Sequence, residues 1–250
     1  MSSRPQYTIK DWLDLHGLTQ DEALKLCQVI RRTYKSQLDA ETIPKNERSF
    51  PAKLELQACL ENIVVPALTD LLGPEAKVEQ VIGNVELLTF EPDALSLAHT
   101  TLCKEKKIPS VRLVWEGKPE NLITLAHETG HAVQMALSNF QFMPPVQREV
   151  CAFLSETAVL THVKNLNLNL FDQLRIDFNA KSKVYLQRNL DRLENDLTAL
   201  CTAYEYRMNY PFARAVSLLP SVTVTSTDKV ALFSSTISQI LQGLASLATR

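Results

Sequence analysis

The sequence has few cysteines, and their placement excludes two common roles. There are five of them, an odd number, and no two form a Cys-x-x-Cys pair. A disulfide framework uses an even and denser set, and a thiolate zinc site uses such pairs. We therefore expect a reducing compartment and a fold that is held together without disulfides.

Long apolar runs and an excess of charge of one sign are also absent. No run approaches the length of about 18 apolar residues that spans a membrane, and the start MSSRPQYTIKDWLDL has no continuous apolar core of a Sec-type signal. The 26 basic and 28 acidic residues give a net charge of −2, with the basic ones dispersed. We expect a soluble protein that binds neither nucleic acid nor membrane. It would be cytoplasmic, or exported by a route without a Sec-type N-terminal signal.

What the sequence does contain is enough apolar material for a substantial core. Of the 250 residues, 45% are hydrophobic, which is typical of a globular protein. The patterns described below predict a mainly α fold with a small β-sheet. We expect a single domain over residues 1–250, made of an N-terminal helical pair over 1–75, a small sheet over 76–118 and a helical core over 119–250.

Two helices are expected in the N-terminal part. Thr19 and Glu22 form a capping box in front of a run with apolar residues at helical spacing. After a polar loop, Pro51 can occupy the first turn of a second helix, which Pro66 would bend and Gly73, followed by a proline, would end.

The pattern changes in the middle of the chain and then becomes helical again. Residues 77–90 (KVEQVIGNVELLTF) and 108–117 (IPSVRLVWEG) are short, rich in β-branched residues and bounded by Gly or Pro, as strands are. Further helices are expected near residues 119–138, 146–166, 170–200, 202–218 and 229–246.

The segment TLAHETGHAVQ, residues 124–134, carries the main chemical signal. His127 and His131 stand four residues apart, so that on a helix both imidazoles can reach one zinc ion. Glu128 lies beside the first histidine, where its carboxylate can take a proton from a zinc-bound water. The alternative is an amphipathic helix with unrelated polar residues. However, the apolar neighbours would bury this segment, and unpaired polar groups are costly there.

A catalytic zinc site needs a third protein ligand, and Glu149 is the candidate. It follows a loop broken by Pro144 and Pro145 and begins EVCAFLSETAVL, which predicts a second helix antiparallel to the first. Glu156, two turns further along the same face, could accept a hydrogen bond from a ligand imidazole. The alternative is that both glutamates are solvated surface residues.

These segments resemble a known family. The stretch IPSVRLVWEGKPENLITLAHETGHAVQMALS from Ile108, with REVCAFLSE ending at Glu156, is similar to the catalytic core of the thimet oligopeptidase and oligoendopeptidase F family of zinc metallopeptidases. The resemblance implies a gluzincin-type HExxH helical core. It also implies one Zn²⁺ per chain bound by His127, His131 and Glu149, with Glu128 as the general base.

A third stretch, TAYEYRMNYPFARAV, resembles the tyrosine-rich segment with which that family polarises the scissile carbonyl. Tyr206 is the first candidate, Tyr204 the second and Tyr210 the third, and the alternative is that these rings are helix packing. The sequence departs from the family at Gln134, where a histidine is usual. The loop before Glu149 is shorter, and most of the helical half that roofs the family's channel is missing, so the family's restriction to short peptides does not transfer.

Together the residues favour a zinc-dependent endopeptidase that acts on a peptide or protein substrate. One alternative is a catalytically inactive binding or regulatory protein with the same fold. Another is a structural zinc protein, which would need a fourth protein ligand that the sequence does not offer.

Overall fold

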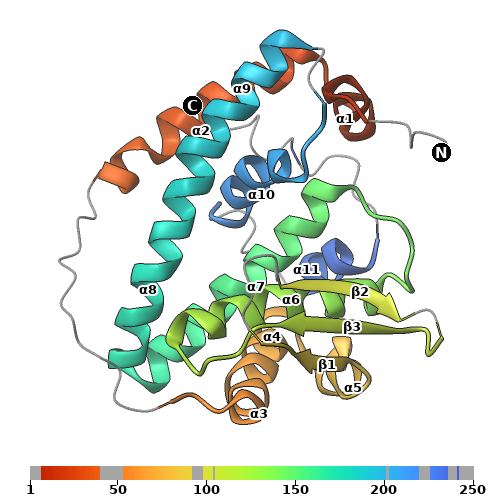
Figure 1. Cartoon of the computed structure of the whole chain (residues 1–250), viewed down its shortest axis with the longest axis vertical. Helices are drawn as coiled ribbons and strands as arrows, with labels where there is room; N and C mark the ends of the chain where they lie inside the picture. The colour runs from red at the N-terminus through yellow and green to blue at the C-terminus, as the bar shows by residue number, and fades with distance from the viewer. Residues whose placement is uncertain are drawn as a thin grey trace.

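The computed structural model describes residues 7–39, 53–91, 98–103, 105–200, 203–219, 226–235 and 241, and for residues 36–39, 226 and 227 it describes the backbone alone. The described chain is mainly helical with a three-stranded sheet, as the sequence predicts (Figure 1). One cluster of buried apolar side chains draws on residues from Ile9 to Leu241. No described helix is long and apolar enough to cross a membrane.

The N-terminal part contains one more helix than expected. Helix α1 (Ile9–His16) precedes α2 (Gln20–Asp39), and α2 begins at the predicted capping box: the Thr19 amide donates to the Glu22 carboxylate over 2.8 Å. The next helix runs through α3 (Leu56–Cys59), the π-helical turn η1 (Leu60–Val64) and α4 (Val65–Leu72).

The start of this second helical segment differs from the prediction. Pro51 lies outside the described residues, and residues 53–55 are not helical. The helix begins at Leu56 because the Glu55 carboxylate accepts hydrogen bonds from the amides of Gln57 and Ala58. It ends before Gly73, as predicted, and the π-helical turn directly precedes α4, in whose first turn Pro66 lies.

Residues 76–118 hold the sheet, but the first predicted strand was partly wrong. Val78–Gly83 is helix α5, because Val78 and Ile82, four residues apart, are buried on one helical face. Strand β1 (Glu86–Thr89) follows it. Strand β3 (Ile108–Leu113) was predicted, whereas β2 (His99–Cys103) was not. β3 lies in the middle, parallel to β1 and antiparallel to β2.

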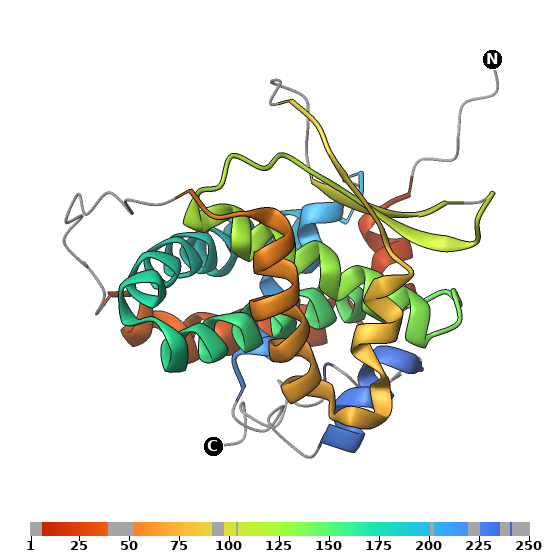
Figure 2. The ribbon, with the colours of Figure 1, turned by 90° about the horizontal axis from the view of Figure 1, so that it is seen from below.

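The C-terminal half begins with the helices that matter most for function. Helix α6 (Pro119–Leu137) and helix α7 (Pro145–Leu166) match the predicted 119–138 and 146–166 within a residue. α6 packs on α7 and on strands β2 and β3, and Figure 2 shows the sheet along one side of these helices. The predicted 170–200 helix is present as α8 (Leu168–Lys183), the π-helical turn η3 (Val184–Asn189) and α9 (Leu190–Ala199).

The last two predicted helices are only partly correct. Residues 203–205 are extended because the Tyr204 amide donates to the Tyr7 carbonyl and Thr8 bridges to Ala203. A 3₁₀ turn, η4 (Tyr206–Asn209), leads into α10 (Tyr210–Ser217), which is shorter than the predicted 202–218. Helix α11 (Ser226–Ser234) covers the start of the predicted 229–246, and most of the rest lies outside the described residues.

Candidate functional site

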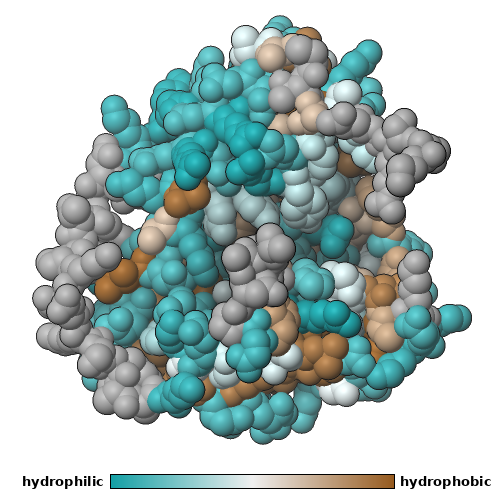
Figure 3. Space-filling model, viewed as in Figure 1, coloured by the Kyte–Doolittle hydropathy of each residue, from teal (hydrophilic) through white to brown (hydrophobic). Residues whose placement is uncertain are grey.

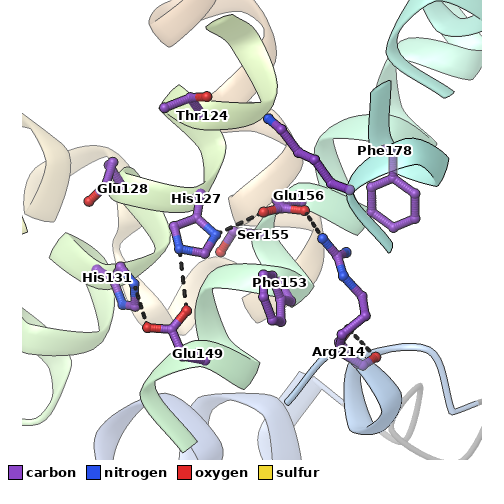
Figure 4. Close-up of polar contacts among 12 residues, drawn as sticks. Thr124, His127, Glu128, His131, Glu149, Phe153, Ser155, Glu156, Phe178 and Arg214 are labelled. Carbon is purple, nitrogen blue, oxygen red and sulfur yellow. Dashed lines mark hydrogen bonds and ion pairs between the residues drawn. The ribbon is translucent and has the colours of Figure 1, made fainter. Parts of the chain in front are cut away.

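The three predicted metal ligands lie together between α6 and α7. One donor atom each from His127, His131 and Glu149 falls within 4.8 Å of the other two. Nε2 of His127 is 3.4 Å from Oε2 of Glu149, and Nε2 of His131 is 3.4 Å from Oε1 of the same carboxylate. Figure 4 shows both imidazoles, from successive turns of α6, pointing toward Glu149 on the neighbouring helix. The i, i+4 spacing and the antiparallel return therefore produce the predicted cluster.

A glycine between the two histidines allows this close approach. A Cβ atom at Gly130 would lie 2.4 Å from Oγ and 2.8 Å from Cβ of Ser155, and 3.0 Å from Cα of Ala152. These contacts are too short for any side chain, so α6 and α7 can approach this closely only with glycine here. The glycine of HETGH thus sets the distance between the histidines and Glu149.

The cluster has the dimensions of a cation site. Two ligand atoms bound to a tetrahedral zinc ion at about 2.0–2.2 Å lie about 3.3–3.6 Å apart. Each histidine nitrogen is at about this separation, 3.4 Å, from a different oxygen of Glu149, which is longer than the roughly 2.7–2.9 Å of a charge-assisted hydrogen bond. Oε2 of Glu149 is buried and has no hydrogen-bond partner among the described residues. Two imidazole nitrogens and a carboxylate are a donor set that zinc binds.

The charges of the cluster favour a positive species between the helices. Although burial opposes it, the carboxylates of Glu149 and Glu156 beside the ring raise the pKa of His127 to about 10. Burial would raise the pKa of Glu149, but the neighbouring His131 and His127 hold that pKa well below its usual range. The site therefore keeps its carboxylate ionised, and a proton and a cation compete for Nε2 of His127.

Glu156 accepts the hydrogen bond that the sequence predicted. Nδ1 of His127 donates to Oε1 of Glu156 over 2.8 Å, which leaves Nε2 directed at the cluster. The other oxygen of Glu156 accepts from Nη2 of Arg214 on α10 over 2.5 Å (Figure 4). Arg214 was not identified from the sequence. The available signal was a lone arginine in the apolar run PFARAV.

Glu128 is 6% exposed and leaves α6 in another direction from the two histidines (Figure 4). The hydroxyl of Thr100 on β2 lies 2.7 Å from Oε2 of Glu128 and 2.9 Å from its backbone carbonyl oxygen. The Thr100 hydroxyl has one proton, which it shares between these two acceptors. Strand β2 therefore orients the glutamate that the sequence assigns to proton transfer. Thr100 carried no signal in the sequence, because the strand that holds it was not predicted.

The three tyrosines differ in their contacts. The Tyr206 hydroxyl donates to Oε1 of Glu149 over 2.7 Å, whereas the Tyr204 hydroxyl accepts from Nδ2 of Asn209 over 2.6 Å. Tyr210 packs on Tyr206 with ring centroids 6.2 Å apart. Burial of the hydroxyl end and the charge of Glu149 raise the pKa of Tyr206 well above its usual range, so the phenol keeps its proton and can donate.

Helix α1, which was not predicted, holds the tyrosine segment in place. Nε1 of Trp12 donates to Oδ1 of the fully buried Asn209 over 2.8 Å. Nδ2 of Asn209 donates in turn to the Tyr204 hydroxyl and to the Tyr206 carbonyl oxygen, each over 2.6 Å. An N-terminal helix therefore contributes to the geometry at Glu149 through Asn209.

An apolar groove of about 330 Å³ is lined by Tyr7, Asp11, Trp12, Leu15, Phe142, Pro145 and Tyr204. Pro145 stands four residues before Glu149 on α7, so the groove wall and the cluster share one helical face about 6 Å apart along the axis. Figure 3 shows a hollow between α10 and the sheet, whereas the lining residues of the groove belong to α1, the start of α7 and the segments beside them. The groove has the size of a small ligand pocket, about 300 Å³ or more.

Comparison with known proteins supports the fold. No protein-family model matches the chain, and no curated protein does. Among solved structures, a putative oligoendopeptidase F from Bacillus anthracis str. Ames superimposes with a TM-score of 0.58 at 13% sequence identity. The match covers 98% of this chain and 53% of the other, so this chain spans about half the length of that protein. The mainly α fold with its small sheet therefore matches that of oligoendopeptidase F.

Proposed function

We propose that this protein is a zinc-dependent endopeptidase with a gluzincin-type site, in which His127, His131 and Glu149 bind one Zn²⁺ per chain. The observation that carries the proposal is the meeting of their three donor atoms within 4.8 Å between α6 and α7. The fold likeness to an oligoendopeptidase supports the same function. A single domain over residues 1–250 accords with the apolar cluster that extends from Ile9 to Leu241.

A zinc ion held by His127, His131 and Glu149 would supply polarisation of the scissile carbonyl and a water whose pKa is lowered to about 7. Glu128, oriented by Thr100, accepts the proton of the attacking water on its carboxylate and passes it to the leaving amine. Tyr206 donates from its hydroxyl to the developing oxyanion, with Tyr204 and then Tyr210 as the next candidates. Because the Tyr206 hydroxyl already bonds to Glu149, it stands at the edge of the ligand cluster.

The proposed partner is a peptide or protein substrate, and neither nucleic acid nor a membrane. The net charge of −2 supports this choice, because a polyanion-binding surface requires clustered basic residues. The apolar groove beside Pro145 would accommodate an apolar side chain of such a substrate. We propose a cytoplasmic location, or export without a Sec-type N-terminal signal.

Two other functions predict different chemistry. A structural zinc site uses four protein ligands, and the described part of the chain supplies three residues to this cluster. An inactive binding protein would not need a hydrogen bond that fixes the glutamate next to His127. The oriented Glu128 and the Tyr206–Glu149 hydrogen bond therefore favour an enzyme.

One experiment separates the endopeptidase from the two other functions. Protein purified without chelator is analysed for zinc, and wild type and Glu128→Gln are assayed on a peptide library with mass-spectrometric detection of new termini. An endopeptidase shows about one zinc per chain in both proteins and cleavage by wild type only. Zinc in both without cleavage indicates a structural or regulatory protein. Absence of zinc, with none taken up on titration, would overturn the proposal.

A further inference from the structure

Arg214 is a fully buried cation inside the helical core. Its relative exposure is 0%, and its guanidinium lies 4.1 Å from the ring centroid of Phe153, 4.5 Å from Phe178 and 5.4 Å from Tyr185. Nη2 donates to Glu156, while Nε and Nη1 have no hydrogen-bond partner among the described residues. Figure 4 shows the side chain reaching from α10 to Glu156 on α7.

Such a pair is not explained by stability alone. Burying two charges costs several kcal/mol per ion, and apolar replacements of a buried pair are often neutral or stabilising. The aromatic faces compensate part of this cost through cation–π interaction. Two guanidinium nitrogens remain unpaired. A core that needed only packing would be served as well by an apolar residue at this position.

We infer that Arg214 is a positioning residue that aligns both halves of the proposed zinc site, an inference that rests on the proposed function. The first half is the ligand His127. Arg214 fixes Glu156 through Oε2, and Glu156 fixes the His127 ring through Oε1. Because Glu156 holds Nδ1, the chain Arg214–Glu156–His127 directs Nε2 toward Glu149, which lies 3.4 Å away.

The second half is the tyrosine segment. Helix α10 begins at Tyr210, directly after the η4 turn of Tyr206–Asn209, and Arg214 lies one helical turn beyond Tyr210. Anchoring Arg214 to α7 therefore fixes the start of α10 and the turn before it. The Tyr206 hydroxyl then reaches Glu149, seven positions before Glu156 on the same helix. One ion pair between α10 and α7 thus links the position of the histidine to that of the tyrosine.

The test must separate positioning from folding. Arg214→Met alone leaves the buried carboxylate of Glu156 without its arginine partner, and this variant can fail to fold. The informative protein is the double variant Arg214→Met with Glu156→Gln, which removes both charges but keeps an amide oxygen that can accept the hydrogen bond from Nδ1 of His127. Arg175→Met is the matched control, because Arg175 also faces a carboxylate, Asp172 at 3.6 Å, and a ring, Phe171 at 5.8 Å, but belongs to α8.

Three properties are measured on the full chain: unfolding by denaturant in the presence of chelator, zinc affinity by competition with a chromophoric chelator, and the visible spectrum after cobalt(II) loading. We expect the double variant to unfold at a denaturant concentration close to that of wild type. Its zinc affinity should be about 10–100-fold weaker, with a changed cobalt spectrum, since loss of such outer contacts has this effect. Arg175→Met should match wild type in both metal measurements.

The outcomes distinguish this inference from the function itself. A stable double variant with wild-type zinc affinity and cobalt spectrum would overturn the positioning role while leaving the zinc site intact. Failure of wild type to bind zinc or cobalt would instead overturn the proposed function. If the double variant does not fold, Arg214→Lys takes its place, because it keeps the positive charge but not the planar guanidinium. Unchanged metal affinity and spectrum in that variant would then overturn the inference.

Discussion

The Tyr206 hydroxyl donates to Oε1 of Glu149 over 2.7 Å, and that oxygen lies 3.4 Å from Nε2 of His131. The tyrosine assigned to the oxyanion is therefore also in contact with a proposed zinc ligand. Tyr206 can orient Glu149, donate to the substrate, or do both in succession. Excess zinc can restore activity after loss of the first role, but not after loss of the second.

We predict that Tyr206→Phe lowers kcat by roughly 10²-fold or more at saturating zinc, with little change in KM, because an oxyanion donor acts mainly in the transition state. The measurement is steady-state kinetics over a range of zinc concentrations. Tyr204→Phe is the control, since its hydroxyl bonds to Asn209 instead. Full recovery of Tyr206→Phe by excess zinc would limit Tyr206 to orienting Glu149. A loss confined to Tyr204→Phe or Tyr210→Phe would place the tyrosine segment in another register.

Zinc should stabilise the folded protein. A ligand that binds only the native state adds about 2.7 kcal/mol at 100 times its Kd, so the Tm with zinc should exceed the Tm with chelator. His131→Ala should abolish this difference, because it removes one of the three donors. His162→Ala is the control, since His162 faces Asp70 instead of the cluster. A zinc-dependent Tm shift that survives in His131→Ala would locate the stabilising ion elsewhere.

The part of the site that could be predicted consists of residues close together in the sequence. His127, Glu128 and His131 lie on one helix, so periodicity places them without knowledge of the fold. The position of Glu149 could be predicted because a short loop brings the next helix back antiparallel to the first. By contrast, Thr100 and Arg214 reach the site from β2 and α10. Their contacts depend on the packing of segments far apart in the chain, which no local pattern encodes.

In the fold, too, the features set by local sequence could be predicted and those set by long-range packing could not. Mainly helical character and the bounds of α6 and α7 follow from spacing and proline positions. The β-branched residues of Val78–Gly83 predict a strand, but this segment is a helix. The preference of such residues for strands is weak, and burial of Val78 and Ile82 on one helical face outweighs it. The sequence predicts a helix over the residues before Tyr206, but these residues are extended. Their backbone pairs with Tyr7 and Thr8, nearly two hundred residues earlier.

Thr100 should matter through its hydroxyl alone. Thr100→Val keeps the shape of the side chain but removes the donor to Glu128, so we expect kcat to fall about tenfold or more, since a hydrogen bond to a charged group contributes about 1.5–3 kcal/mol. Thr100→Ser retains the hydroxyl and should stay within a few-fold of wild type. Zinc content should be unchanged in both variants. Equal activity of the valine and serine variants would show that β2 does not orient the base.

Gly130→Ala tests whether the distance between the two helices sets the site. Alanine favours a helix over glycine by about 1 kcal/mol, so without a packing constraint the variant would be more stable. The new Cβ would instead lie 2.4 Å from Oγ of Ser155 and 3.0 Å from Cα of Ala152, and the second contact involves backbone that cannot rotate away.

We therefore expect Gly130→Ala to be destabilised by about 1–3 kcal/mol, the usual cost of overpacking, and to bind zinc more weakly because α6 moves away from Glu149. Denaturant unfolding and zinc titration measure the two effects. Gly83→Ala, at the last residue of helix α5, is the matched control: nothing lies within 4 Å of its added Cβ, so it should be at least as stable as wild type and bind zinc equally well. Adding Ser155→Gly to Gly130→Ala removes the shortest contacts and should recover part of the zinc affinity. If Gly130→Ala is as stable as wild type and binds zinc equally well, the close approach of α6 and α7 is not what brings the histidines to the carboxylate.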